Sequence, residues 1–570
     1  MKHKIVFLII SFCFAIKIVA QNTVLDVTYH GAVGDGKTLN TECLQGVIDE
    51  LHAHGGGQAY FPAGRYLTGS LQLKSGVTLY LERGAVLLGS TSPYDYPHVE
   101  PQSDLKVNDD HFNQALIYAD GAERIGIMGY GTVDGQGREL ALAIDSLHHT
   151  GELVDPHYNT YRKRPNTRPK LVYMRRCADV DIRNIRAGSS AAWGLSFEQC
   201  SRLTLDSLRV ENRAYWNNDG IDISDCKDVR VSNCLINSAD DGICLKSHNR
   251  DVWNDRISIS NCRIVSSASA IKFGTESAGG FKNVTIDSIW VKDTFRSAIA
   301  IESVDGAEIE NIHISNVRAL HTGNALFIRL GHRSGEKPGR VRNVTVKNLY
   351  VEVPFGRPDI DYDLRGPAVT FFHNPFPASI SGIPGHAVED VTLENIEIVY
   401  PGRASKGMAY MPLSRLEDVP ENVKGYPEFT MFEELPSWGF YVRHVKGIRM
   451  KDIRLRLKED DFRPAFVFDR VSGLSLTDID LPETKRGGQV VLRKSGLQEA
   501  DEGVKEEVLE IENYSCGISC YAGFRAHAVG KLSQSVNLPT ARDYKSGVTD
   551  TSVINCSLFT INYQKFFILH

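Results

Sequence analysis

The stretch Val180-Asp181-Ile182-Arg183-Asn184-Ile185 decides the fold, because its pattern returns along most of the chain. Apolar and polar residues alternate in it, which is typical of a half-buried β-strand. Related phrases stand at residues 203–208, 229–234, 257–262, 284–289 and 312–317. Their fifth position recurs every 23 to 28 residues, at Asn184, Ser207, Asn233, Asn261, Ser288 and Asn316.

This period, with short strands and no helical segments between them, predicts an all-β fold, a parallel β-helix in which each repeat forms one coil. The phrase continues with wider gaps at residues 344–349, 391–396, 448–453 and 474–479. Those gaps predict loops inserted into the later coils, chiefly residues 354–386 and 400–440. We expect one β-helix domain over residues 21–497, followed by an unassigned extension, residues 498–570.

Residues 39–54 have a helical pattern instead. Their apolar side chains recur at spacings of three and four after Asn40-Thr41, at Leu44, Val47, Ile48 and Leu51. Asn at this point is a plausible helix cap. We expect an N-terminal capping helix that covers the open end of the β-helix and protects its apolar interior.

The first twenty residues have the features of a secretory signal peptide. Lys2 and Lys4 precede an apolar run over residues 5–16, and Ala20 ends the segment. An uncleaved anchor is the alternative, but the run is short for crossing a bilayer. Cleavage removes three lysines and no acidic residue, which changes the net charge from −6 to −9. We expect a secreted or periplasmic protein that is monomeric and free of the membrane in its mature form.

The composition argues against some classes of partner and cofactor. Lys and Arg total 64 against 70 Asp and Glu, and this mild acidity argues against nucleic acid as the main partner. The cysteines show no Cys-x-x-Cys or Cys/His spacing of a metal site. Five of them fall at recurring positions of the repeat and are interpreted as buried small side chains, namely Cys177, Cys200, Cys226, Cys234 and Cys262. No metal and no cofactor are expected.

A second strand in each coil places acidic residues in one column. Asp219-Gly220-Ile221-Asp222-Ile223 aligns with Asp241-Gly242-Ile243-Cys244-Leu245, and the third and fifth positions are apolar throughout. Stacked strands lie about 4.8 Å apart, so Asp219 and Asp241 are expected to be vertical neighbours, with Asp240 beside them. Like charges this close disfavour joint ionisation and raise at least one pKa. Solvated turn residues beside glycine are the alternative interpretation.

These residues resemble a known family. Asn217-Asn218-Asp219-Gly220 and Asp240-Asp241-Gly242 are similar to the Asn-Thr-Asp-Gly and Asp-Asp motifs of glycoside hydrolase family 28, the polygalacturonases and rhamnogalacturonan hydrolases. Gly31–Gly36, Pro62–Tyr66 and Tyr130–Gly137 resemble bacterial members. The resemblance covers roughly residues 25–495. It implies a right-handed parallel β-helix of the pectin-lyase type whose cleft binds an acidic plant polysaccharide.

The resemblance also implies roles in an inverting mechanism. Asp240 would be the general acid that protonates the glycosidic oxygen, and Asp219 and Asp241 would hold and deprotonate the attacking water. An inverting site places its acid roughly 6.5–9.5 Å from the base. Substrate-binding candidates are Asn217 of the same motif and the nearby cations Lys272, Arg296 and Arg329. Arg suits a carboxylate through its bidentate fork.

Two departures from polygalacturonases bear on the substrate. The family's Gly-His-Gly aligns on Ala268-Ser269-Ala270, which lacks the histidine. Its Arg-Ile-Lys aligns on Ala300-Ile301-Glu302, which replaces two cations with a neutral residue and an acid. Glu302 would repel a galacturonate in the leaving-group subsite. We therefore expect α-galacturonosyl linkages to a neutral sugar such as rhamnose to be cleaved, and the long insertions favour exo action.

Other functions remain open from the sequence. A polygalacturonase acting on homogalacturonan is the nearest alternative. A pectate lyase-like enzyme would use calcium held by the aspartate column. A non-catalytic glycan-binding β-helix would have no use for three acidic residues in register.

Overall fold

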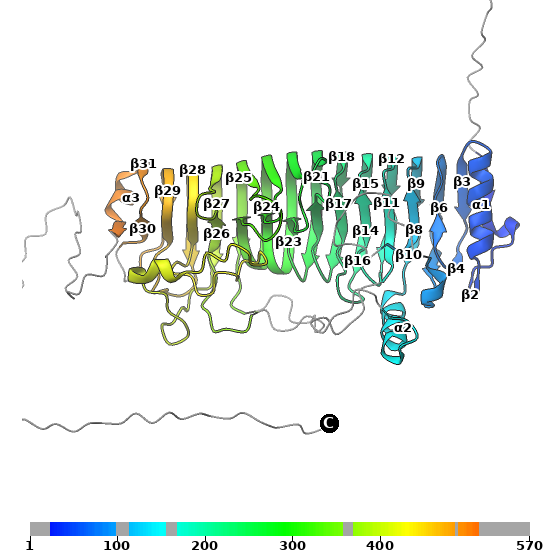
Figure 1. Ribbon diagram of the computed structural model, residues 1–570, viewed down its shortest axis with the longest axis horizontal. Helices are drawn as coiled ribbons and strands as arrows, with labels where there is room; N and C mark the ends of the chain where they lie inside the picture. The colour runs from blue at the N-terminus through cyan, green and yellow to red at the C-terminus, as the bar shows by residue number, and fades with distance from the viewer. Residues whose placement is uncertain (1–22, 98–112, 155–167, 357–368, 485–487, 512–570) are drawn as a thin grey trace, which may run out of the picture. The chain divides into compact units, whose positions relative to one another are not determined.

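The computed structural model describes residues 23–97, 113–154, 168–356, 369–484 and 488–511. The predicted signal peptide and most of the predicted C-terminal extension lie outside these residues. The described strands pair in parallel and form three stacks that run along one row of coils (Figure 1). This confirms the predicted parallel β-helix.

The first stack contains the repeated phrase. Its members, each paired with the next, are β1 (Val24–Asp26), β3 (Gly57–Phe61), β6 (Val77–Leu81), β9 (Glu123–Gly129), β12 (Ala178–Arg183), β15 (Ser201–Asp206), β18 (Lys227–Ser232), β21 (Trp253–Ser266), β23 (Gly280–Ser303), β24 (Glu308–Leu330), β25 (Arg340–Glu352), β27 (Val388–Tyr400), β28 (Phe440–Leu457), β29 (Phe466–Asp480) and β31 (Leu497–Ala500). The apolar positions of the phrase point into the coil, where Ile182, Leu205 and Val231 are fully buried.

The second stack follows the first in each early coil. It contains β2 (Asp35–Leu39), β4 (Gly64–Thr68), β7 (Ala85–Gly89), β10 (Thr132–Asp134), β13 (Arg186–Gly188), β16 (Arg209–Asn212) and β19 (Leu235–Ser238), and it continues into β21. From β21 onward several strands are long, because one such strand takes part in more than one stack.

The third stack contains the predicted acidic strands. It consists of β5 (Leu71–Gln72), β8 (Ala115–Asp120), β11 (Lys170–Arg175), β14 (Leu195–Glu198), β17 (Ile221–Ser224), β20 (Ile243–Lys246), β22 (Ile271–Phe273), β26 (Ala378–Ser381), β30 (Val490–Arg493) and β32 (Val508–Ile511), together with parts of β23, β24, β28 and β29. β31 pairs with β29 in the first stack, and β32 pairs with β30 in the third. The β-helix therefore extends beyond residue 497, the boundary that the sequence predicted.

Helices are few in the described residues. The predicted N-terminal helix is present as α1 (Thr41–Ala53), and its buried Leu44, Val47, Ile48 and Leu51 face β3, β5 and β6. Asn40 does not cap it through its side chain, which bonds the backbone of Val33 instead. The others are α2 (Gly137–Thr150), α3 (Glu502–Glu506) and the 3-10 turns η1 (Val27–His30), η2 (Pro93–Asp95) and η4 (Leu413–Asp418). The capping role of α1 stays a prediction.

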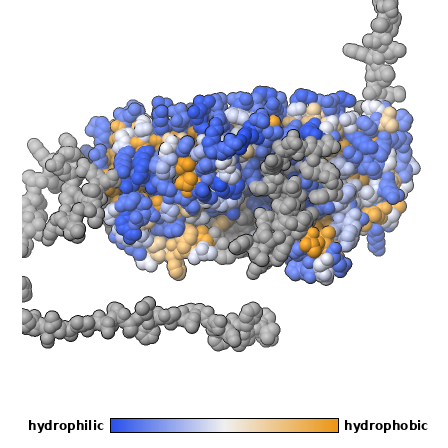
Figure 2. Space-filling model, in the orientation of Figure 1, coloured by the Kyte–Doolittle hydropathy of each residue, from blue (hydrophilic) through white to orange (hydrophobic). Residues whose placement is uncertain are grey.

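One face of the surface is largely hydrophilic. Hydrophilic side chains dominate the face seen in Figure 2, and apolar groups gather only in small patches. Among the described residues, no helix is long and apolar enough to cross a membrane. The five repeat cysteines are buried and unbridged, as predicted: Cys177, Cys200, Cys226, Cys234 and Cys262.

The insertion at residues 400–440 packs on the third stack. Outward side chains of that stack, Ala300, Phe327, Tyr441, Val467 and Val491, share one apolar cluster with residues of the insertion, Leu416, Val419, Phe429, Met431, Phe432 and Leu435. The predicted loop 354–386 is interrupted by β26, which continues the same stack. The outward face of the third stack is therefore filled on its C-terminal side.

Asparagines at positive φ form a ladder at the turns between stacks. Asn311 has φ 57°, donates a hydrogen bond to Asn283 and accepts one from Asn343. Asn348 does the same between Asn316 and Asn395. Asparagine tolerates the left-handed region better than most residues with a Cβ, and its amide can link one coil to the next. The recurrent Asn in the repeated phrase is thus explained by turn geometry.

We expect Asn311→Ala to lower the free energy of unfolding by roughly 1–3 kcal/mol, since it adds left-handed strain and removes two side-chain hydrogen bonds. Asn311→Gly, the matched control, should lose less because glycine adopts positive φ freely. Urea denaturation of the two variants measures the difference. Equal losses would show that strain contributes nothing at this turn.

Candidate active site

Two buried asparagines fix the turn that leads to Asp219. The Asn218 side chain accepts a hydrogen bond from the backbone N–H of Tyr215 at 2.5 Å and donates to the carbonyls of Ser190 and Ala192. Asn212 donates to the carbonyl of Asp219 at 2.8 Å. The backbone that presents Asp219 is therefore held by side-chain amides and not only by strand pairing.

Close approach of the coils explains the glycines of the acidic motifs. A Cβ on Gly220 would lie 2.5 Å from the carbonyl oxygen of Gly242, and one on Gly242 would lie 2.6 Å from that of Ala270. Only glycine fits such contacts. β17 and β20 can therefore bring Asp219 and Asp241 into one column, and the predicted register is confirmed by the pairing of Ile221 with Ile243.

The three predicted acids meet at the start of these strands. Each of Asp219, Asp240 and Asp241 offers a carboxylate oxygen, and the three atoms lie within 4.8 Å of one another. Asp219 and Asp241 are each 4% exposed, while Asp240 is half-buried. Asp219 and Asp241 are therefore not solvated turn residues, which excludes the alternative interpretation for these two.

Their surroundings separate the pKa values of the two buried acids. Burial raises the pKa of Asp219 well above its usual range, and the carboxylates of Asp222, Asp240 and Asp241 raise it further. Burial also opposes ionisation of Asp241, but Lys272 and Arg296 outweigh it and lower the pKa of that group. Asp241 is thus the more readily ionised member of the pair, and Asp219 the member that keeps its proton to higher pH.

Lys272 is the cation that the structure brings to this column. Its Nζ lies 3.0 Å from Oδ2 of Asp241 and 3.9 Å from Oε2 of Glu302, and all three side chains are almost fully buried. Burial disfavours the charged form of Lys272, but Asp241, Tyr426 and Glu302 outweigh burial and raise its pKa well above the usual value. Lys272 is therefore an ion-pair partner in the free protein.

Comparison with known proteins identifies the family to which the chain belongs. The model of the family described as glycosyl hydrolases family 28 matches residues 62–357, more than half of the chain. The chain belongs to glycoside hydrolase family 28. It is therefore a glycoside hydrolase, and the family expected from its motifs is confirmed.

Two curated relatives illustrate the similarity. A protein of Vitis vinifera named "Probable polygalacturonase" is 30% identical over 400 residues, which cover 66% of this chain and 74% of the relative. An "Exo-poly-alpha-D-galacturonosidase" of Dickeya chrysanthemi is 28% identical over 254 residues, which cover 39% of this chain and 41% of the relative.

Solved structures agree on the fold. A hyperthermoactive exopolygalacturonase from Thermotoga maritima superposes with a TM-score of 0.55 at 20% identity, over 76% of this chain and 92% of the other. A family 28 exopolygalacturonase of Yersinia enterocolitica gives a TM-score of 0.54 at 16% identity, over 81% of this chain and 79% of the other. At these identities the superpositions establish the β-helix alone.

The structure corrects one predicted substrate contact of this family 28 protein. Arg329 is 1% exposed, and its guanidinium donates to Ser381 and to the backbone carbonyls of Gly382, Glu421 and Asn422. It ties the 400–440 insertion to β24 and cannot reach a substrate. The prediction was wrong because the insertion covers the outward position.

The remaining candidates also have protein partners. The guanidinium of Arg296 lies 2.6 Å from the carboxylate of Glu428. The side-chain oxygen of Asn217 accepts a hydrogen bond from Arg168 at 2.9 Å, and its backbone has φ 55°. Asn217 thus shapes the turn before Asp219, and its contact with substrate stays a prediction.

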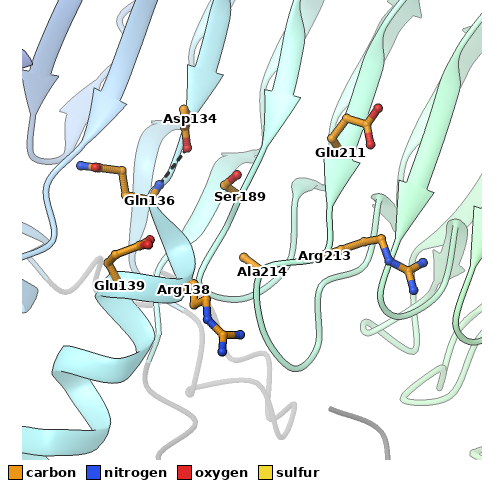
Figure 3. Close-up of a pocket in the computed structure, with 8 residues that line it drawn as sticks. All are labelled: Asp134, Gln136, Arg138, Glu139, Ser189, Glu211, Arg213 and Ala214. Carbon is orange, nitrogen blue, oxygen red and sulfur yellow. Dashed lines mark hydrogen bonds between the residues drawn. The ribbon is translucent and has the colours of Figure 1, made fainter. Parts of the chain in front are cut away.

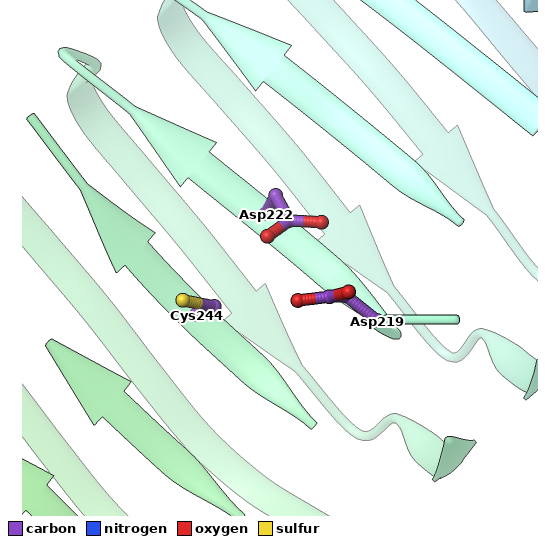
Figure 4. A group of neighbouring side chains, drawn as sticks. All are labelled: Asp219, Asp222 and Cys244. Atoms are coloured by element: carbon purple, nitrogen blue, oxygen red, sulfur yellow. The ribbon is translucent and has the colours of Figure 1, made fainter. Parts of the chain in front are cut away.

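Two acidic groups resemble metal sites at first sight. Asp219, Asp222 and Cys244 converge within 4.8 Å (Figure 4), as do the three column acids. A metal ion requires deprotonated ligands. Burial raises the pKa values of both Asp219 and Cys244 well above their usual ranges, and Lys272 already neutralises Asp241. Asp219 and Cys244 therefore keep their protons to a higher pH than usual, and a metal ion would have to displace those protons.

A surface cavity of about 480 Å³ lies elsewhere. Asp134, Gln136, Arg138, Glu139, Ser189, Glu211, Arg213 and Ala214 line it, at the junction of α2 with the second stack (Figure 3). None of the three column acids belongs to it. We therefore assign the chemistry to the acid column and not to this cavity.

The sequence predicted that Glu302 lies near the site, but it did not predict the protonation state of this side chain. Glu302 is 3% exposed, and burial raises its pKa to about 8 from 4.5, despite the opposing effect of Lys272. The folded protein thus favours the protonated form. That contribution to stability is fully present below pH 4.5 and is lost as the pH rises through about 8.

We expect Glu302→Gln, which stays neutral, to be no more stable than the parent at pH 4.5 and increasingly more stable towards pH 9. Each unit of pKa shift corresponds to about 1.4 kcal/mol. Denaturation midpoints across this pH range measure the difference, with the exposed Glu336→Gln as the matched control. A pH-independent difference would contradict the buried, protonated Glu302.

Proposed function

We propose that this family 28 hydrolase is an exported, inverting, exo-acting enzyme that cleaves α-galacturonosyl linkages to rhamnose in pectic polysaccharide. The observation that carries the proposal is the column of Asp219, Asp240 and Asp241 with Lys272 paired to Asp241. A pectic substrate is in keeping with the names of the relatives. Export rests on the signal peptide expected at residues 1–20.

The environments of the three acids suggest their roles. Asp240, the most exposed of the three, is the general acid that protonates the glycosidic oxygen. Asp241 is held ionised by Lys272 and accepts the proton of the attacking water. Asp219 keeps its proton to higher pH than Asp241, so we assign it to orienting that water beside Asp241.

The carboxylates lie closer together than is usual for inversion. Their nearest oxygens lie within 4.8 Å, whereas inverting glycosidases commonly separate the two carboxyl groups by about 6.5–9.5 Å. Inversion is therefore proposed from the family resemblance and from one water shared by Asp219 and Asp241. The anomeric configuration of the first product, followed by NMR, tests it, and retained configuration would refute the shared-water assignment.

The surroundings of Lys272 favour a neutral leaving sugar. Cations on this side of the column are already paired, Lys272 with Asp241 and Arg296 with Glu428. Ala300 lies in the apolar cluster under the insertion, so the space of the arginine expected in polygalacturonases is filled. A galacturonate there would meet Glu302 without a free cation, whereas rhamnose brings no charge.

The same cluster supports exo action. Leu416, Phe429 and Phe432 of the insertion pack against Phe327 and Tyr441 on the outward face of the third stack. A polysaccharide cannot continue along a face that is filled by side chains. The binding surface therefore ends close to the acid column on its C-terminal side, and an enzyme closed at one end works from a chain end.

Hydrolysis of homogalacturonan is the second candidate. It is supported by the names of the relatives, which include a probable polygalacturonase and an exo-poly-alpha-D-galacturonosidase. The two candidates differ in the sugar that leaves, and substrate comparison separates them.

We expect Asp240→Asn to reduce kcat by about 10²–10⁴-fold on an unactivated glycoside, because it removes the transferable proton and keeps the shape. The thermal midpoint should stay close to that of the parent. Initial rates on a pectic oligosaccharide measure the loss. A variant with near-normal turnover would exclude Asp240 as the acid.

We expect the wild type to cleave galacturonosyl-rhamnose linkages roughly 5–150-fold faster than galacturonosyl-galacturonate linkages, the equivalent of about 1–3 kcal/mol for an unpaired carboxylate beside Glu302. Chromatographic product profiles on matched oligosaccharides measure this ratio. Early release of only the shortest product supports exo action. Faster cleavage of oligogalacturonate would favour the second candidate and leave the hydrolase intact.

A further inference from the structure

Lys246 is a buried cation whose role none of the preceding contacts explains. It ends β20, two residues after Cys244, and its side chain is 7% exposed. Its backbone carbonyl accepts hydrogen bonds from Asp225 and Asn254, but among the described residues its ammonium forms no hydrogen bond and no ion pair. Its ammonium lies 4.8 Å from the centre of the Trp193 ring, a cation–π contact.

Its place relative to the acid column follows from the strand register. Lys246 pairs with Ser224 of β17, and Cys244 pairs with Asp222. Trp193 precedes β14 at the position where Asp219 precedes β17, because Gly194 and Gly220 occupy equivalent positions before Leu195 and Ile221. Lys246 thus starts on the coil of Asp241, and its ammonium reaches back to Trp193, which lies one coil before Asp219. The ammonium therefore lies towards the N-terminal side of the column, away from Lys272 and Glu302.

The charge of Lys246 is retained despite its burial. Burial disfavours the ammonium, but Cys244, Glu276, Asp222 and Asp219 outweigh burial and raise its pKa well above the usual value. These groups act at a distance and supply no direct partner. A desolvated ammonium without a bonded anion favours binding of one.

The other cations near the column differ in this respect. Lys272 is bonded to Asp241, Arg296 to Glu428, and Arg329 to carbonyl oxygens of the insertion. Each would have to give up a protein partner before it could bind a substrate carboxylate. Lys246 would not.

We propose that Lys246, held against the Trp193 ring, binds the carboxylate of a uronic acid residue of the substrate. This residue is the one that lies from the cleaved bond towards the N-terminal coils of the β-helix. The inference rests on the proposed function and sharpens it: a uronate on the Lys246 side and a neutral sugar on the Glu302 side define the linkage. Lys246 acts as a specificity residue that distinguishes a free acid from its uncharged ester.

The test compares a galacturonosyl-rhamnose substrate with its methyl ester, which has the same linkage and no charge. In the wild type the free acid should be the better substrate. Lys246→Met should lower kcat/KM for the acid by about 10–150-fold, the range expected for a lost charge-assisted hydrogen bond, and for the ester by less than about threefold. Lys246→Arg should keep part of the preference for the acid.

Controls separate binding from structure. Exposed Lys227→Met is the matched control and should leave both rates unchanged. Thermal midpoints show whether Lys246→Met is folded, and Lys246→Arg keeps the test valid if it is not. Equal losses on the acid and the ester would mean that Lys246 only balances the charge of Asp219 and Asp222, which would overturn the proposal.

Binding in the absence of turnover separates this inference from the proposed function. In an Asp240→Asn background, calorimetry with galacturonate and its methyl ester should show acid-selective binding that Lys246→Met abolishes. If the wild type hydrolyses neither substrate but this selectivity is present, the proposed function fails and the Lys246 site stands. If hydrolysis occurs and the selectivity is absent or survives Lys246→Met, the site fails alone.

Discussion

The site depends on the spacing of parallel strands. Because successive coils lie about 4.8 Å apart, residues far apart in sequence but equal in register become contacts. Asp219 and Asp241 meet for this reason, and glycines at 220 and 242 permit the close approach of the coils. The same spacing places Lys272 one coil beyond Asp241, within 3.0 Å of its carboxylate. The acidic side chains and Lys272 therefore meet because the backbone repeats from coil to coil.

The acids of this column differ in the cations that lie beside them, and this difference separates their roles. Asp241 has a cation and Asp219 has none at bonding distance, so their pKa values shift in opposite directions. Glu302 lies beside the same Lys272, but its burial outweighs that cation and keeps it protonated below about pH 8. A buried, protonated carboxyl group can thus line a site for an acidic polysaccharide without repelling it at mildly acidic pH.

Much of this could be predicted from the sequence, because periodicity determines register and register determines which residues stack. The acid column and the neighbouring Lys272 followed from alignment of the coils alone. Arg329 could not be placed, because its outward position is covered by the carbonyls of residues 421 and 422, and the path of an insertion has no period. Lys246 carried no signal either, since a lysine after an apolar strand is indistinguishable from a surface lysine until its missing partners are known.

The asparagine ladder and the stacked strands also affect the order in which the coils fold. In a solenoid each coil contacts its two neighbours, so structure can nucleate in one region and propagate in both directions. The short coils over residues 178–266 carry no large insertion and close with small loops, so their contacts are local in sequence. The acid column lies in this segment. The reaction centre can thus assemble from local contacts alone, and the insertion that closes the substrate surface would dock onto that scaffold.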